Sequence, residues 1–138
     1  MRVLGLDVGD RRIGVALSDA LGATAQPLTV LERRGLGQDV EAIAALATGH
    51  QAAAVVVGLP LTMQGKQGEQ AKRVLAFVEA LRNRLSCPVH LMDERLTTRQ
   101  GERALLETDT SRRKRKRLID QVAAQLILQS YLDGTAKR

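Results

Sequence analysis

The stretch VLGLDVGDRRIGVAL, residues 3–17, decides the fold. It contains two apolar runs, residues 3–8 and 13–17, joined by a short segment of glycine and charged residues. Apolar runs of this length around a tight turn are typical of a β-hairpin. Asp7 interrupts the first run, and Gly5 and Gly9 on either side carry no side chain, so another group can approach the backbone there. The stretch therefore predicts a sheet with a carboxylate inside one of its strands.

The chain after the hairpin alternates short apolar runs with amphipathic segments. Short β-branched or apolar runs predict strands, and apolar residues at helical spacing predict helices. The resulting order, β-β-β-α-β-α-β-α-α, predicts an α/β fold with one mixed sheet and helices on its faces. No linker is evident, so residues 1–138 are expected to form one domain. The further strands are expected at residues 28–31, 53–57 and 89–92, and the helices at 40–47, 71–85, 97–106 and 118–132.

The positive charge is concentrated in one segment. The chain has 21 Lys and Arg against 15 Asp and Glu, a net charge of +6, and residues 112–117 form an unbroken run of six basic residues. A local excess of this kind is typical of a contact with phosphate polyanions. Because adjacent like charges repel, residues 108–116 are expected to form a mobile loop. The alternative is a solvated helix start without a partner.

Composition excludes several classes of protein. Phe77 and Tyr131 are the only aromatic residues and there is no Trp, which argues against a base-stacking platform for single strands. The single cysteine, Cys87, cannot form an internal disulfide and suits a reducing compartment. No apolar run is long enough to cross a membrane, and the start of the chain lacks the layout of a secretion signal. We therefore expect a cytoplasmic protein with no membrane partner.

Three carboxylates stand where apolar neighbours predict apolar residues. Asp7 lies inside the first strand, Glu94 follows the strand at 89–92, and Asp120 shares a helix side with small apolar residues. If the first strand is central, these acids can converge at one rim of the sheet. Crowded carboxylates need a cation, and oxygen ligands without Cys or His favour Mg²⁺ or Mn²⁺ over zinc. Two such ions about 4 Å apart can support phosphodiester cleavage.

Each acid also has a purely structural interpretation, which the sequence leaves open. Asp7 could close the hairpin turn by accepting hydrogen bonds from backbone amides. Glu94 could pair with a neighbouring arginine. Asp120 could be a first-turn acid that complements the dipole of the last helix. Asp93 fits a cap or supporting acid better than a metal ligand.

Four motifs stand in order along the chain: DVGDRRIGVA at 7–16, GLPL at 58–61 with Gly65 and GEQA at 68–71, DERLTT at 93–98, and DQVAAQLILQSYL at 120–132. Together they resemble one known family. The chain is similar to the YqgF/RuvX family of pre-16S rRNA nucleases, which have a Holliday junction resolvase-like, RNase H-like fold. The D-x-G element alone also occurs in sugar-kinase and actin-like ATPases, but those need two such lobes and 138 residues supply one.

The resemblance implies a five-stranded sheet in the order 3-2-1-4-5 with the second strand antiparallel. It also implies that Asp7, Glu94 and Asp120 are the catalytic, metal-binding acids of a cytoplasmic, Mg²⁺- or Mn²⁺-dependent enzyme that trims the 5′ end of the 16S rRNA precursor. Basic residues near these motifs are expected to contact the nucleic acid: Arg11, Arg12, Arg95, Arg112, Arg113, Lys114, Arg115, Lys116 and Arg117.

Three functions remain in competition at this point. An RNA nuclease is favoured, a DNA Holliday junction resolvase is second, and a noncatalytic nucleic-acid-binding factor is third. A resolvase must cut two related strands and so calls for a two-fold dimer, whereas one RNA strand needs one site. No second apolar stripe is evident for a large dimer interface, so a monomer is expected.

Overall fold

A five-stranded mixed sheet forms the centre of the molecule in the computed structural model, which describes residues 1–93 and 112–136. Its strand order is β3-β2-β1-β4-β5. β1 pairs antiparallel with β2 and parallel with β4, so the first strand is central. The predicted α/β class, strand order and antiparallel second strand are confirmed. The strands are β1 Arg2–Val8, β2 Arg12–Ser18, β3 Ala25–Glu32, β4 Ala52–Leu59 and β5 Val89–Asp93.

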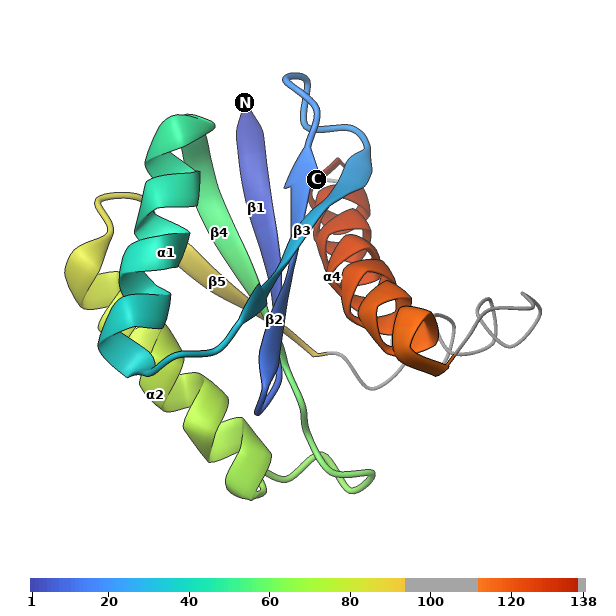
Figure 1. Ribbon diagram of the computed structural model, residues 1–138. Helices are drawn as coiled ribbons and strands as arrows, with labels where there is room; N and C mark the ends of the chain where they lie inside the picture. The colour runs from blue at the N-terminus through green and yellow to red at the C-terminus, as the bar shows by residue number, and fades with distance from the viewer. Residues whose placement is uncertain (94–111, 137–138) are drawn as a thin grey trace.

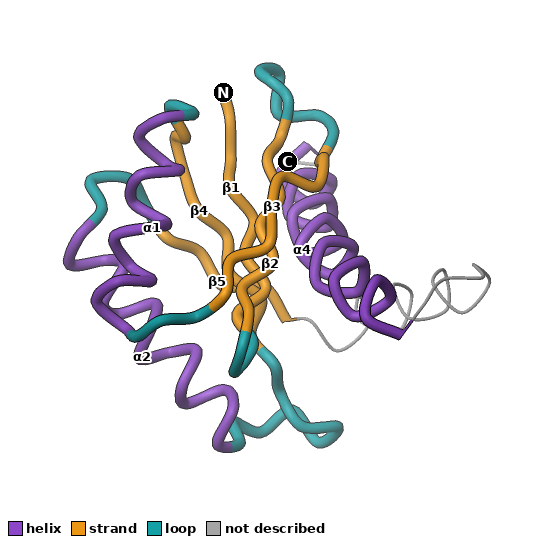
Figure 2. The backbone as a smooth tube through the Cα atoms, in the orientation of Figure 1, coloured by secondary structure: helices purple, strands orange, loops and turns teal. Residues whose placement is uncertain are grey.

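Helices cover both faces of this sheet. α1 (Leu36–Gly49) and α2 (Glu69–Arg84) lie on one face, and α4 (Arg112–Ala136) crosses the other (Figure 1). The β1–β2 turn and the β4–α2 loop lie at the same end of the sheet (Figure 2). The helix predicted at 97–106 lies outside the described residues. Among those described, no helix is both long enough and apolar enough to cross a lipid bilayer.

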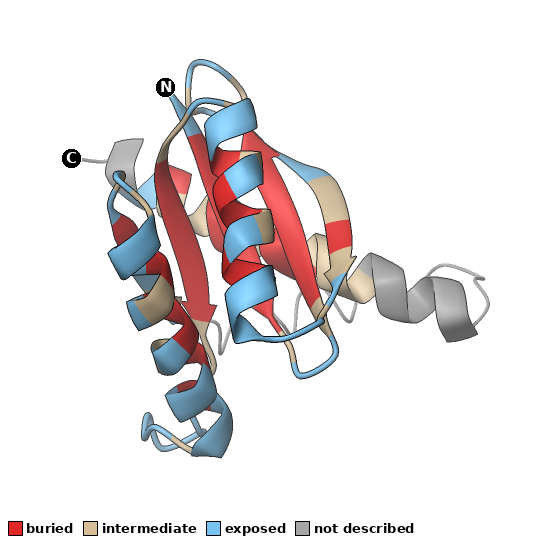
Figure 3. Cartoon of the chain, turned by 60° about the vertical axis from the view of Figure 1, so that its left-hand side comes forward, coloured by how far each residue is buried: buried red, intermediate tan, exposed pale blue. Residues whose placement is uncertain are grey.

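The side chains of β1 alternate between two different layers. Leu4, Leu6 and Val8 belong to the larger apolar cluster, which includes Phe77 of α2. The opposite side of β1, which faces α4, carries Val3, Gly5 and Asp7. Buried residues fill most of β1, β2 and β4 and the inward sides of the helices (Figure 3). The alternation of side chains along β1 therefore separates the larger apolar cluster from a layer that includes a carboxylate.

The layer under α4 is thin because glycines replace side chains in it. A Cβ added at Gly5 would lie 2.6 Å from the Cβ of Leu128. A Cβ added at Gly14 would overlap the backbone carbonyl of Asp120. The helix backbone therefore rests directly on β1 and β2.

The basic run is helical, which corrects the predicted loop. α4 begins at Arg112, so residues 112–116 form its start, and the helix predicted at 118–132 is longer at both ends. Lys and Arg are good helix formers, and each like-charge pair one turn apart costs only about 0.2–0.5 kcal/mol. Burial of Ala124 and Leu128 further along anchors the helix, which outweighs that repulsion. Residues 108–111 lie outside the described part.

Candidate metal centre

Asp7 is held near the end of β1, on the face that α4 covers. Its residue is half-buried, and its direct partner across the β1–β2 pair is Gly14. Direct partners in an antiparallel pair share a face, with side-chain positions about 5 Å apart. Because Gly14 has no side chain, the space beside the Asp7 carboxylate is open to a residue from α4.

Asp120 supplies that residue. Its backbone carbonyl lies on Gly14, so Asp120 is a neighbour of Asp7 on the same face of the sheet. Asp120 follows the start of α4 at Arg112 by more than two turns. The first-turn interpretation of Asp120, as an acid that complements the helix dipole, is therefore wrong. The structure brings together two of the three acids that the sequence singled out.

Arg12 pairs with Asp120 at this site. Its Nε lies 2.9 Å from the Oδ2 of Asp120, and the two side chains are 25% and 24% exposed. Arg12 comes from β2 at an even-numbered position, like Gly14, and so points to the same face. The Arg12–Asp120 ion pair thus lies beside the position of Asp7, where β1, β2 and α4 come together.

The remaining predicted residues are spread differently. Glu94 and Arg95 lie outside the described residues. Asp93 is exposed at the end of β5, opposite Leu59 of β4. Arg11 is exposed in the β1–β2 turn. The start of α4 carries Arg112, Arg113, Lys114, Arg115, Lys116 and Arg117, and this end of the helix lies beyond the strands, at the lower right of Figure 1.

The donors at this edge suit a hard divalent cation. Asp7 and Asp120 offer carboxylate oxygens, the ligands that Mg²⁺ and Mn²⁺ prefer. His90 stacks on Tyr131, with ring centroids 5.5 Å apart, toward the other part of α4. Residues 1–93 and 112–136 contain no group of three His, Cys, Asp or Glu side chains that could hold a metal ion. Within the described ranges, Asp7 and Asp120 are therefore the two carboxylates that this site offers.

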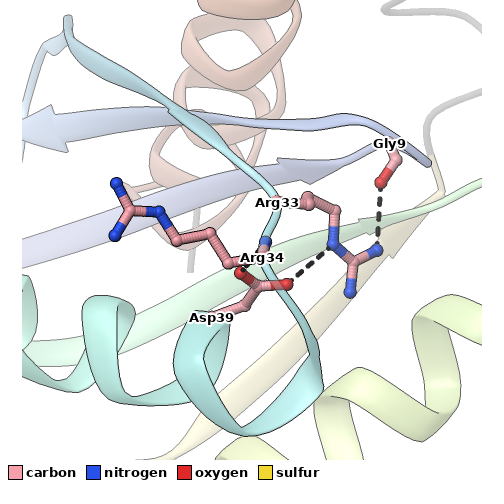
Figure 4. Close-up of polar contacts among 4 residues, drawn as sticks. All are labelled: Gly9, Arg33, Arg34 and Asp39. Carbon is pink, nitrogen blue, oxygen red and sulfur yellow. Dashed lines mark hydrogen bonds and ion pairs between the residues drawn. The ribbon is translucent and has the colours of Figure 1, made fainter.

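A partly buried ion pair, between Arg33 and Asp39, lies against the turn that follows Asp7, and the sequence analysis did not predict it. Arg33 donates from Nη1 to the carbonyl of Gly9 and from Nε to Oδ2 of Asp39, both at 3.0 Å (Figure 4). The backbone N–H of Arg34 donates to the other Asp39 oxygen, and the Arg33 guanidinium lies 5.4 Å from the centre of the Phe77 ring. An aspartate in the first turn of an apolar helix, after two arginines, was the available signal.

Replacing Asp39 tests how firmly this contact holds the turn. Burial raises the pKa of Asp39, but hydrogen bonds from Arg34, Arg33 and Gly35 outweigh it, so the net pKa is lowered. Asp39→Asn is expected to lower the free energy of unfolding by about 2 kcal/mol at pH 7. Because the pKa of Asp39 is lower in the folded protein than in the unfolded chain, its ionised form stabilises the fold. This stabilisation is complete above the unfolded-state pKa of about 4 and is lost as the pH falls through the folded-state pKa.

Urea unfolding at several pH values measures this difference. The gap between wild type and Asp39→Asn should be constant from about pH 7 to 5 and should narrow below about pH 4. Glu41→Gln, at an exposed ion pair with Arg84, is the matched control and should change stability little. A gap that grew on acidification would contradict the assigned direction of the Asp39 pKa.

Solved structures define the class of fold. RuvC from Thermus thermophilus superimposes with a TM-score of 0.60 at 17% identity, covering 99% of this chain and 97% of that chain. The Fowlpox virus resolvase, solved with substrate Holliday junction DNA, superimposes with a TM-score of 0.61 at 14% identity, covering 98% and 99%. The chain has the RNase H-like fold of the RuvC-type resolvases, as the resemblance implied.

The family is narrower than this fold. A family model described as RuvX, Holliday junction resolvase, matches residues 1–134. A relative from Moorella thermoacetica, named "putative pre-16S rRNA nuclease", is 53% identical over 133 residues, covering 96% of this chain and 95% of the relative. A relative of the same name from Clostridium novyi is 47% identical, covering 97% and 99%. The chain belongs to the RuvX family.

Proposed function

We propose that this protein is a divalent-metal-dependent nuclease that hydrolyses phosphodiester bonds in RNA, at the 5′ end of the 16S rRNA precursor. The observation that carries the proposal is the placement of Asp7 and Asp120 side by side on a resolvase-type sheet. An acid inside a buried strand is costly unless a cation or a set of hydrogen bonds compensates it. Membership of a family with relatives named as pre-16S rRNA nucleases supports the RNA substrate.

The metal ligands in this proposal are Asp7, Asp120 and Glu94. Asp7 and Asp120 supply two carboxylates from β1 and α4, and Glu94 follows directly after β5 in the sequence. Two Mg²⁺ or Mn²⁺ ions would activate a water molecule and stabilise the leaving oxygen. Asp7 lies in the central strand and would position the metal ions at its end, next to the turn whose Gly9 carbonyl accepts a hydrogen bond from Arg33.

The basic residues at the start of α4 supply affinity in this proposal. Lys and Arg that neutralise phosphates release counterions, and on single strands each contact contributes about 0.7 to the slope of log affinity against log salt. Replacing Arg113, Lys114, Arg115 and Lys116 with Ala should therefore reduce this slope by about 2 to 3. Fluorescence anisotropy with labelled RNA from low to moderate salt measures it. An unchanged slope would mean that this end of α4 points away from the substrate.

A junction resolvase is the second candidate because the family model carries that description and solved resolvases share the fold. A resolvase must cut two symmetry-related strands and needs a stable dimer.

We propose a cytoplasmic monomer, formed by residues 1–138 as one domain. The large apolar side chains that are exposed in the described part come from separate segments, including Leu21, Leu36 and Met63.

Cleavage assays on defined substrates discriminate the two candidates. The protein should cleave precursor-type RNA in Mg²⁺ or Mn²⁺, nick a four-way DNA junction poorly, and sediment as a monomer at micromolar concentration. A tight dimer that makes two symmetric nicks in one binding event and leaves RNA intact would replace the RNA nuclease with a resolvase.

A further inference from the structure

The ion pair between Arg12 and Asp120 has a feature that the proposed function leaves unexplained. Asp120 is a proposed metal ligand, yet its Oδ2 accepts a hydrogen bond from Arg12 Nε. The contact uses one nitrogen of the guanidinium. Within residues 1–93 and 112–136, the structure gives the Nη1 and Nη2 nitrogens of Arg12 no hydrogen bond or ion pair. Among these residues, Arg12 therefore holds the acid with one donor and has four N–H groups left.

A partly exposed, single-point contact of this kind is easily exchanged. Ion pairs with this exposure change an equilibrium constant by less than about tenfold. At a separation of about 5 Å, a divalent cation and the guanidinium charge repel each other. Even at the dielectric constant of bulk water, this repulsion weakens binding of the cation to Asp120 by about tenfold. Arg12 and a metal ion thus compete for the same carboxylate.

We propose that Arg12 is the counter-cation of Asp120, that it leaves the carboxylate when a divalent ion binds, and that its guanidinium then binds the scissile phosphate. This inference rests on the proposed nuclease function. A planar guanidinium matches a phosphate with two parallel hydrogen bonds, which a lysine cannot reproduce. Arg12 lies beside Asp7 and Asp120, where a phosphate bound to the metal would sit.

The opposite role is a fixed support for Asp120. Hydrogen-bonded partners that orient a metal-ligating carboxylate typically improve metal affinity by about 10- to 100-fold. The two roles predict opposite changes in Mn²⁺ affinity when Arg12 is replaced. Removing a competing charge tightens metal binding, whereas removing a support weakens it.

Isothermal titration calorimetry with Mn²⁺, in the absence of nucleic acid, measures this change in affinity. Arg12→Gln removes the charge and should bind Mn²⁺ about tenfold more tightly than wild type. Arg12→Lys keeps the charge and should stay within about threefold of wild type. Arg34→Gln removes an exposed charge that is not part of the Arg12–Asp120 ion pair, and it should leave the Mn²⁺ affinity unchanged. Thermal unfolding shows that each variant is folded.

Cleavage supplies the second readout. Arg12→Gln should cleave RNA at least about tenfold more slowly at saturating Mn²⁺, because the phosphate contact is lost. Tighter metal binding with slower cleavage is not expected from a damaged fold. Equal or weaker Mn²⁺ binding by Arg12→Gln, or equal tightening by Arg12→Lys, would overturn this inference alone. Absence of Mn²⁺ binding by the wild type would overturn the proposed function with it.

Discussion

Asp7→Asn should lower metal-dependent RNA cleavage by about 10³-fold or more and leave RNA affinity largely intact. The change removes a charged metal ligand but barely alters volume, and the ion supplies several kcal/mol of stabilisation to the transition state. Asp7 lies in β1, the central strand of the sheet. Single-turnover cleavage at saturating Mn²⁺, with RNA binding measured in parallel, separates the loss of chemistry from the loss of affinity.

Asp10→Asn is the matched control for this experiment. Asp10 is exposed in the turn next to the site and pairs with Arg73 at 3.4 Å. Its replacement should change the cleavage rate by less than about threefold, because exposed pairs contribute little. Full activity of a folded Asp7→Asn protein would remove the catalytic assignment and favour the noncatalytic nucleic-acid-binding factor.

Gly14→Ala is expected to be the most damaging small substitution in the sheet. The added methyl would overlap the Asp120 carbonyl, which is backbone and cannot rotate away, so α4 must move. Overpacking of this kind costs about 3 kcal/mol in the free energy of unfolding. Displacement of α4 also moves Asp120 from Asp7, so residual folded protein should cleave RNA poorly. Chemical unfolding and a cleavage assay on the same preparation measure both effects.

Gly37→Ala provides the comparison. Gly37 lies in α1 with nothing within 4 Å of an added Cβ, so alanine should stabilise the helix by about 0.5–1 kcal/mol. Equal stabilities of Gly14→Ala and wild type would show that α4 does not rest on β2 as described.

Local patterns made the sheet predictable. Asp7 and Gly14 lie in runs whose apolar residues predict strands. The two residues are seven positions apart, and the hairpin pairs them directly. The third strand is longer than the predicted 28–31, because residues 25–27 and Glu32 also pair with β2. Pro27 is unusual inside a strand and concealed this extension. Short-range signals of this kind need no knowledge of the rest of the fold.

The long-range parts could not be read in the same way. The pairing of Arg12 with Asp120 joins residues 108 positions apart, and Gly14 acquires its importance only when a distant helix packs on it. The start of α4 depends on buried residues that anchor it further along, against the repulsion within its own basic run. Arg33 and Asp39 look like surface charges until folding buries the aspartate.

The most direct test of the site is a calorimetric titration of Mn²⁺ into wild type, Asp7→Asn and Asp120→Asn. If the two aspartates share a metal, wild type should show saturable binding, and each variant should bind at least about tenfold more weakly. Asp10→Asn should match wild type. Binding of Mn²⁺ by both Asp7→Asn and Asp120→Asn with wild-type affinity would contradict the metal centre at this edge of the sheet.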